Sequence, residues 1–307
     1  MAVRGTQSFV RVLGECWSRP SLLALEILWR WLFGVPLLAI LAWQGLLIYS
    51  AMTSQLAAAG IDRFSMVDPM RAAVIASDVY AVIAPPVFRT ALWLAPIVIL
   101  VWAVLSGAGR NAVLRRYDPS LSKRPVTLSV LQLLRAVFLC GSFAFWFWAV
   151  QWAANYALGG DEPNPVAYCA LVICLSLGIF TLWALVSWVF SIAPLLVLLE
   201  DRTVSSSLVR SFRLGPLTGK LVEINLIMGI IKLALVVLAM VFSAVPIPFA
   251  SVMEGPPLYV WWAIVTVLYL VASDFFQVAR LVAFIRLWRG LAVASQATSI
   301  QNAVRVK

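Results

Sequence analysis

Six long runs of apolar residues alternate with short polar and charged segments along this chain of 307 residues. An α-helix rises ~1.5 Å per residue, so about 20 apolar residues cross the ~30 Å hydrocarbon core of a bilayer. Each run is close to that length or longer, which predicts an all-α protein, a polytopic bundle of six transmembrane helices over residues 32–290. The predicted spans are about 32–52, 88–106, 128–158, 166–199, 221–246 and 258–286.

Two helices are also expected before and between the first spans. Pro20 suits the first turn of a helix, so the N-terminal segment 1–31 is expected to hold an interfacial helix. We favour a lead-in that continues into the first span over a separate helix. In the outside segment 53–87, Asp68-Pro69 predicts a helix start, and Pro85-Pro86 is expected to end that helix before the second span.

A shorter segment, residues 203–214, has the pattern of an amphipathic helix on the cytoplasmic surface. Thr203 is a plausible N-cap, and Gly215-Pro216 would stop the helix. The two faces differ in character, with Val204, Leu208 and Phe212 on the apolar one and Ser206, Arg210 and Arg213 on the polar one. This face of basic residues is expected to contact lipid headgroups or a partner protein.

Basic residues are distributed unevenly between the two sides of this layout. Of the 23 Lys and Arg residues, 17 lie in segments assigned to one side, while Arg63, Arg71 and Arg89 lie on the other and Arg135, Lys232 and Arg280 lie inside spans. Basic residues resist translocation, so both termini, including a tail at 291–307, are expected in the cytoplasm. The expected location is a cell inner (plasma) membrane, as a multi-pass protein.

Composition excludes several classes of function. Hydrophobic residues make up 63% of the chain and charged residues 12%, against about 25% charged in a soluble domain. The bilayer must therefore be the main solvent. The net charge of +10 is attributed to anionic lipid headgroups on the cytoplasmic face and not to nucleic acid, because no soluble basic domain is visible.

Histidine is absent, which rules out a Ser-His-Asp triad and an HExxH zinc site. No Gly-x-Ser-x-Gly motif and no paired acidic metal motif are present, so an enzyme is not expected, nor a cofactor or a bound metal. The four cysteines are placed in spans or in the inner N-terminal segment, where they are interpreted as apolar packing residues rather than a disulfide framework.

Two charges inside the spans are the candidate site. Lys232 and Asp274 are each ~18 Å above the inner end of their span, near the bilayer middle, where one charge costs about 2.5–3.5 kcal/mol. Their equal depth and opposite sign predict a pair between spans five and six. Polar residues nearby could extend it into a polar interior: Asn225, Gln277, Arg280 and Glu223. An ion or substrate path and a structural pair that sets helix register both remain open.

Residues 193–235 contain a longer motif. Ala193-Pro194 is followed by aliphatic residues and Glu200, then by Ser207-Leu208-Val209-Arg210-Ser211-Phe212-Arg213-Leu214 and a new span. This pattern resembles a bacterial family of six-helix inner-membrane proteins that includes the membrane domain of some glycerophosphodiester phosphodiesterases. The resemblance implies an integral inner-membrane protein, mostly of unknown activity. No soluble phosphodiesterase domain accompanies the motif, so that activity is not carried over.

Two functional hypotheses follow. The first is a non-enzymatic scaffold or accessory subunit in envelope or transport processes, which would use the surface helix and the basic loop 110–124 to bind a membrane-protein partner or a second copy of the chain. The second is a transporter or lipid-handling protein that uses the polar interior around Lys232 and Asp274.

Overall fold

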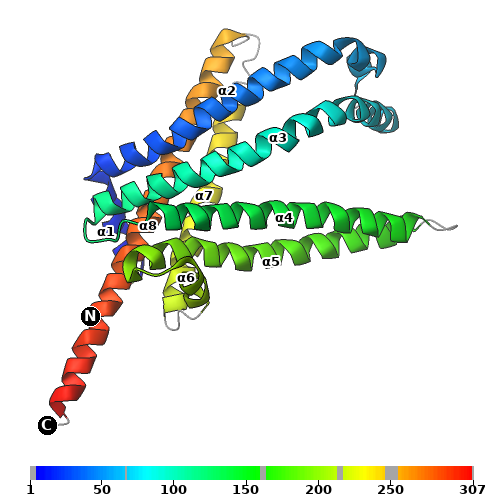
Figure 1. The fold of residues 1–307 in the computed structure, drawn as a ribbon. Coiled ribbons are helices and arrows are strands. Elements are labelled where there is room, and N and C mark those ends of the chain that lie inside the picture. Colours follow the sequence, from blue (N-terminus) through cyan, green and yellow to red (C-terminus); the bar gives the residue numbers. More distant parts are fainter. Residues whose placement is uncertain (1–4, 66–67, 160–163, 213–216, 246–254, 306–307) are drawn as a thin grey trace.

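The computed structural model describes residues 5–65, 68–159, 164–212, 217–245 and 255–305. Every regular element in these ranges is helical, which confirms the all-α prediction (Figure 1). The elements in chain order are α1 (Gly5–Trp17), α2 (Pro20–Ala58), the short 3-10 helix η1 (Ile61–Arg63), α3 (Pro69–Tyr117), α4 (Pro125–Leu158), α5 (Pro165–Glu200), α6 (Val204–Ser211), α7 (Leu217–Ala244) and α8 (Pro256–Arg305).

Six of these helices, α2, α3, α4, α5, α7 and α8, are long and apolar enough to cross a membrane. At most 22% of the apolar window of each one is buried inside the protein. Apolar side chains exposed on this scale need an apolar solvent, so the structure supports a multi-pass membrane protein.

Proline begins most of the long helices, as its fixed φ and missing N–H allow. Asp68 caps α3 as predicted, because its carboxylate accepts hydrogen bonds from the backbone N–H groups of Met70 (3.1 Å) and Arg71 (3.2 Å). The lead-in at Pro20 is continuous with the first span, also as predicted.

The predicted helix end at Pro85-Pro86 is wrong, because α3 continues through both prolines to Tyr117. Helices α2 and α5 likewise contain an internal proline, at Pro36 and Pro194. A proline removes one hydrogen bond of the helix, but an apolar environment leaves the neighbouring backbone groups no better partners than the helix itself. At the other end of the chain, α8 extends through the predicted tail to Arg305.

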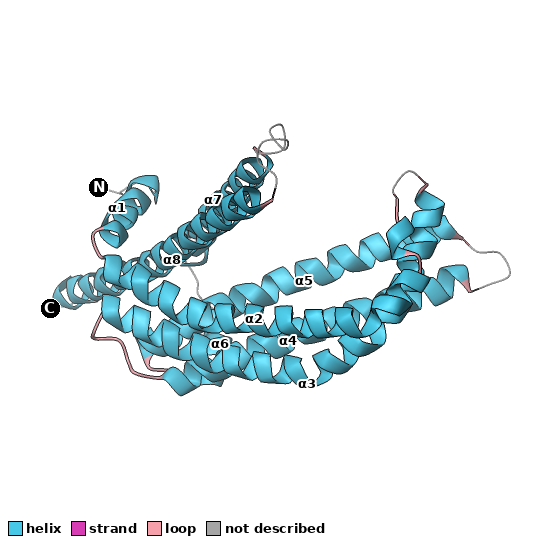
Figure 2. Ribbon diagram, turned by 90° about the horizontal axis from the view of Figure 1, so that it is seen from above, coloured by secondary structure: helices cyan, strands magenta, loops and turns pink. Residues whose placement is uncertain are grey.

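The long helices form two parts that diverge from a common end. Helices α2, α3, α4 and α5 lie side by side in chain order, and α7 and α8 form a separate hairpin (Figure 1). The view from above confirms that the hairpin points away from the α2–α5 layer (Figure 2). Contacts between the two parts run mainly through α8, which packs against α2 and α3 and also against α1.

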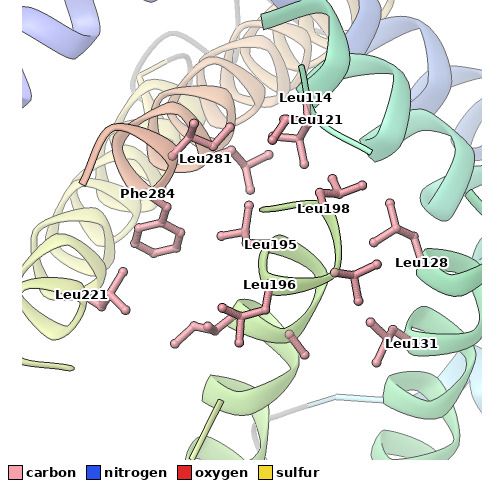
Figure 3. Packing of buried hydrophobic residues seen from close by; sticks show 14 residues of the cluster. Leu114, Leu121, Leu128, Leu131, Leu195, Leu196, Leu198, Leu221, Leu281 and Phe284 are labelled. Carbon is pink, nitrogen blue, oxygen red and sulfur yellow. The ribbon is translucent and has the colours of Figure 1, made fainter. Parts of the chain in front are cut away.

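The common end has a densely buried core, and we call it the packed end. One cluster joins the inner parts of α3, α4, α5, α7 and α8, including Leu128, Leu196 and Phe284 (Figure 3). A second cluster brings α1 and the start of α2 onto α8, through Val12, Leu22 and other residues. The segments that the sequence assigns to the cytoplasm therefore meet at one end of the molecule.

Two glycines allow the helices of the layer to approach closely. A Cβ atom on Gly107 of α3 would lie 2.3 Å from Ser129 Oγ and 2.5 Å from its backbone nitrogen in α4. A Cβ atom on Gly109 would lie 2.3 Å from the Trp29 ring of α2. Small residues of this kind permit tight contact between membrane helices.

Helix α6 lies on α5 and α4 at the packed end, and its buried residues are Ser207 and Ser211. Val204 and Leu208 pack against the core beside them, whereas Phe212 is 75% exposed. The prediction that Phe212 shares a face with Val204 and Leu208 is therefore wrong. Phe212 is the C-cap residue, one step beyond the last helical residue, and most of its side chain is exposed.

Candidate functional site

Asp274 forms its ion pair with Arg30 of α2, so the predicted pair with Lys232 is wrong. Depth alone suggested that pair, but depth does not determine which side of a helix a residue occupies. Helix α8 contacts both α2 and α7, and Asp274 is buried on the side that meets α2. Lys232 is exposed on α7, and the structure records no ion pair for it within the described ranges.

Arg30 is held from two sides. Its Nε atom lies 2.8 Å from Glu26 Oε1, one helical turn earlier on α2, and its guanidinium stacks 5.4 Å from the Trp29 ring centroid. The Trp29 indole N–H in turn donates to Glu26 Oε2 at 2.9 Å. Glu26 is only 1% exposed; its Oε2 accepts the hydrogen bond of Trp29, and its Oε1 has the ion-pair contact with Arg30 but no hydrogen bond.

Four further cations surround this group, each from a different helix. Arg110 of α3, Arg135 of α4 and Arg280 of α8 lie within electrostatic reach of one another and of Arg30. The ammonium group of Lys232 on α7 interacts electrostatically with the guanidinium groups of all four arginines. We call these seven residues the basic cluster: Arg30, Arg110, Arg135, Lys232 and Arg280, with Glu26 and Asp274.

The basic cluster has more cations than carboxylates. Arg110, Arg135, Lys232 and Arg280 have no carboxylate within 4.0 Å in the part of the chain that the structure describes. Arg280 Nε is buried without a hydrogen-bond partner. Five positive groups therefore share two negative ones, a balance that leaves the site attractive to an anion.

Buried polar atoms next to the cluster also lack partners. Ser106 lies one turn before Arg110 on α3 and Asn111 directly after it, and Gln132 lies three residues before Arg135 on α4. Ser106 Oγ, Asn111 Oδ1 and Gln132 Oε1 are buried without a hydrogen bond to another protein group. Unpaired buried polar groups are rare in folded proteins and often mark a place for a ligand or water.

The other predicted site residues are placed differently. Gln277 is buried on α8, between Asp274 and Arg280 in the sequence, and adds polar character there. Asn225 is half-buried and Glu223 exposed, nearer the start of α7, and neither forms a described hydrogen bond or ion pair with the cluster. Arg210 lies 4.0 Å from Glu200, and Arg213 lies outside the described residues.

A second set of charges, which we call the rim pairs, connects the loops and helix ends of the packed end. Arg286 pairs with Glu15 of α1, and Arg289 with Asp118 after α3. Arg124 pairs with Asp201 at 2.7 Å, joining the start of α4 to the end of α5. Glu200 pairs with Arg202 and Arg210. Each of these five arginines faces a carboxylate.

Sequence reasoning missed Arg30, Arg110 and Arg135 as members of the site. Arg30 and Arg110 flank apolar runs, so they were counted with the basic residues of the inner segments. Arg135 lies inside a span and could approach the depth of Arg280 on α8, but nothing in the linear pattern linked it to α2 or α3. The spacing of Glu26 and Arg30, four residues apart on one helix face, was the available signal.

Comparison with protein-family models, with curated proteins and with solved structures gives no match. Within the described ranges, no group of three or more His, Cys, Asp or Glu side chains is arranged to hold a metal ion. The chemistry available at the basic cluster is that of guanidinium and ammonium groups, which bind carboxylate and phosphate oxygens through charge-assisted hydrogen bonds.

Proposed function

We propose that this protein is a lipid-handling or transport protein that binds an anionic group at the basic cluster. The observation that carries the proposal is the unmatched charge, five cations against two carboxylates where five helices converge. The chain would thus use the interior predicted around Lys232 and Asp274, enlarged by three arginines that the sequence did not assign to it.

Energetics favour an anion over a purely structural role. Unpaired charges removed from water carry a solvation cost, and neighbouring like charges repel one another. A structural polar contact lowers this cost by pairing each charge, as the rim pairs do. A bound phosphate or carboxylate would compensate the excess at the basic cluster in the same way.

The position of the cluster along the helices supports a ligand at the level of the lipid headgroups. Arg30 comes directly before the apolar run of α2, and Arg110 comes directly after that of α3. On α4, residues 136–158 after Arg135 are still long enough to cross the hydrocarbon core. We therefore place the inner membrane boundary near these three arginines, which puts Lys232 and Asp274 nearer to that boundary than the bilayer middle expected from counting residues. Both termini would be cytoplasmic in an inner membrane, as the basic loops favour.

An accessory-subunit role is the second candidate, and one observation favours it. Val209 of α6 and Phe212, directly after α6, are 59% and 75% exposed at the packed end. Two apolar side chains there suit a lipid interface or a partner protein, as the resemblance to six-helix inner-membrane proteins would also allow. Phe212→Ser should release a partner protein in a pull-down from native membranes without changing anion binding.

The test of the main proposal uses purified protein in a neutral detergent. Glycerol phosphate and a short-chain phosphatidic acid are added separately, and thermal unfolding is followed. An anion that saturates the site at 100 times its Kd stabilises the fold by about 2.7 kcal/mol, a Tm rise of several degrees. Arg110→Gln should remove this rise.

The matched control is Lys220→Gln, which removes one positive charge from the exposed start of α7. It should leave the anion-dependent rise in Tm unchanged. An equal loss in both variants, or no rise in the unmodified protein with either anion, would contradict an anion site at the basic cluster.

A further inference from the structure

An open apolar groove runs between the outer parts of α7 and α8, with a volume of ≈ 560 Å³. This volume lies within the range of small-molecule and cofactor sites. Its lining is almost entirely apolar or aromatic and comes from both helices: Val236, Ala239, Met240, Ser243, Ala244, Trp262 and Tyr269.

The groove has a defined outer end. The indole N–H of Trp262 donates to the backbone carbonyl of Ser243 at 3.1 Å, and that of Trp261 donates to the carbonyl of Phe242 at 2.8 Å. These bonds tie the outer ends of α7 and α8 together. Because its N–H is already bonded to the protein, the Trp262 ring contributes an apolar wall.

The inner end of the groove leads toward the basic cluster. On α7, Lys232 lies one turn before Val236, on the helix face that continues through Ala239 and Ser243. On α8, Arg280 lies eleven residues after Tyr269, which returns to the same face after three turns. The two helix faces that line the groove thus carry a cation each, below its apolar part.

We propose that this groove holds one acyl chain of an anionic glycerophospholipid whose phosphate lies at Lys232 and Arg280. This inference rests on the proposed function and names its ligand. The distance along α7 from Lys232 to Ser243 is ~16 Å, about half of the ~30 Å hydrocarbon core. A phosphate at the cations would thus place its acyl chain along the groove toward the outer ends of α7 and α8.

Charge and shape select this occupant over others. A soluble anion would satisfy the cations and leave the apolar groove unused. A neutral lipid would fill the groove and leave the cations unmatched. A ligand with an anionic group at one end and a hydrocarbon chain at the other uses both features, as an anionic glycerophospholipid does, and the groove is open so that a lipid can enter from the side.

The experiment is photo-crosslinking in nanodiscs of phosphatidylcholine. The probe is phosphatidylglycerol with a diazirine at the end of one acyl chain, and phosphatidylcholine with the same chain is the neutral comparison. Peptide mass spectrometry should locate adducts of the anionic probe on α7 residues 236–244 and α8 residues 262–269. Excess phosphatidylglycerol should compete with labelling, and excess phosphatidylcholine should not.

Four variants test the two halves of the proposed site. Lys232→Gln should lower labelling by the anionic probe roughly fivefold, and Lys232→Arg should retain it. Ala239→Trp should block the groove and abolish specific labelling. Ala234→Trp adds the same bulk to the exposed opposite face of α7 and should have no effect.

Equal labelling by the two probes, or full labelling of Ala239→Trp, would overturn the lipid assignment. If glycerol phosphate still stabilises the protein in that case, the anion site of the proposed function stands and only its lipid occupant is wrong. If neither glycerol phosphate nor phosphatidic acid stabilises it and no anionic probe labels it selectively, both proposals fail.

Discussion

The rim pairs and the basic cluster are two charged regions of one molecule with opposite balance. In the rim pairs, Arg286, Arg289 and Arg124 each face a carboxylate of another segment, and these pairs join loops and helix ends at the packed end. In the basic cluster, Arg30 alone has close carboxylates. Paired charges thus join separate segments at the packed end, whereas the excess of positive charge in the basic cluster is the basis for the anion site that we propose.

Removing one carboxylate from each region should give the largest difference in the free energy of unfolding. Asp274→Asn should lower the free energy of unfolding by about 3 kcal/mol, because it leaves a half-buried Arg30 with Glu26 alone. Asp201→Asn, which breaks a pair whose carboxylate is 62% exposed, should cost less than about 1 kcal/mol. Denaturation of both variants in the same detergent measures the difference, and similar costs would remove the distinction between the regions.

The reactivity of the Cys16 thiol measures whether α1 stays packed against α8. Burial, and secondarily the charge of Glu15, raises the pKa of the Cys16 thiol to about 11. An unfolded thiol has a pKa of about 8.5, so alkylation of Cys16 at pH 8 should be slower than in unfolded protein by more than 100-fold. Rapid alkylation in the native protein would show that α1 opens.

The same shift has a consequence for stability. Because the folded pKa is the higher one, the contribution of Cys16 to stability is complete below pH 8.5 and is lost as the pH rises toward 11. Cys16→Ser should shift the alkaline limb of the stability profile. Glu15→Gln should change it less, because burial is the larger cause.

Close helix approach is what brings the arginines of α2, α3 and α4 together. Gly107→Ala should cost roughly 1–3 kcal/mol, since its Cβ atom would overlap the Ser129 backbone. Gly141→Ala, which meets no atom within 4 Å, should instead gain up to about 1 kcal/mol from helix propensity. Thermal unfolding distinguishes the signs, and a gain in both variants would mean that α3 and α4 lie farther apart.

Removing a cation from the basic cluster should stabilise the anion-free protein by a small amount. Arg280→Met removes one of the mutually repelling cations, so in the absence of an anion it should raise the free energy of unfolding by about 1 kcal/mol. The same variant should lose stabilisation by phosphatidic acid. Destabilisation of the anion-free protein by Arg280→Met would indicate that Arg280 has a structural role like that of the rim arginines.

The linear pattern of residues predicted most of the helices, but it did not predict which charged residues form the candidate site. Asp68 and the prolines at helix starts act through neighbours within four residues, so their roles are visible in sequence. Counting residues predicted that Lys232 and Asp274 lie at similar depths. It did not predict their partners, because a partner depends on how each helix is rotated about its axis, which long-range packing determines.

By itself, the sequence determined that this protein is all-α, that six helices are long and apolar enough to cross a membrane, and where most of them begin. Those properties follow from local hydrophobicity and backbone chemistry. Only the tertiary structure decided that Asp274 meets Arg30, and that Arg110, Arg135, Lys232 and Arg280 gather around them. The physical reason is that contacts such as Gly107 with Ser129 set how closely the helices pack, and charges on five different helices become neighbours only after that packing is complete.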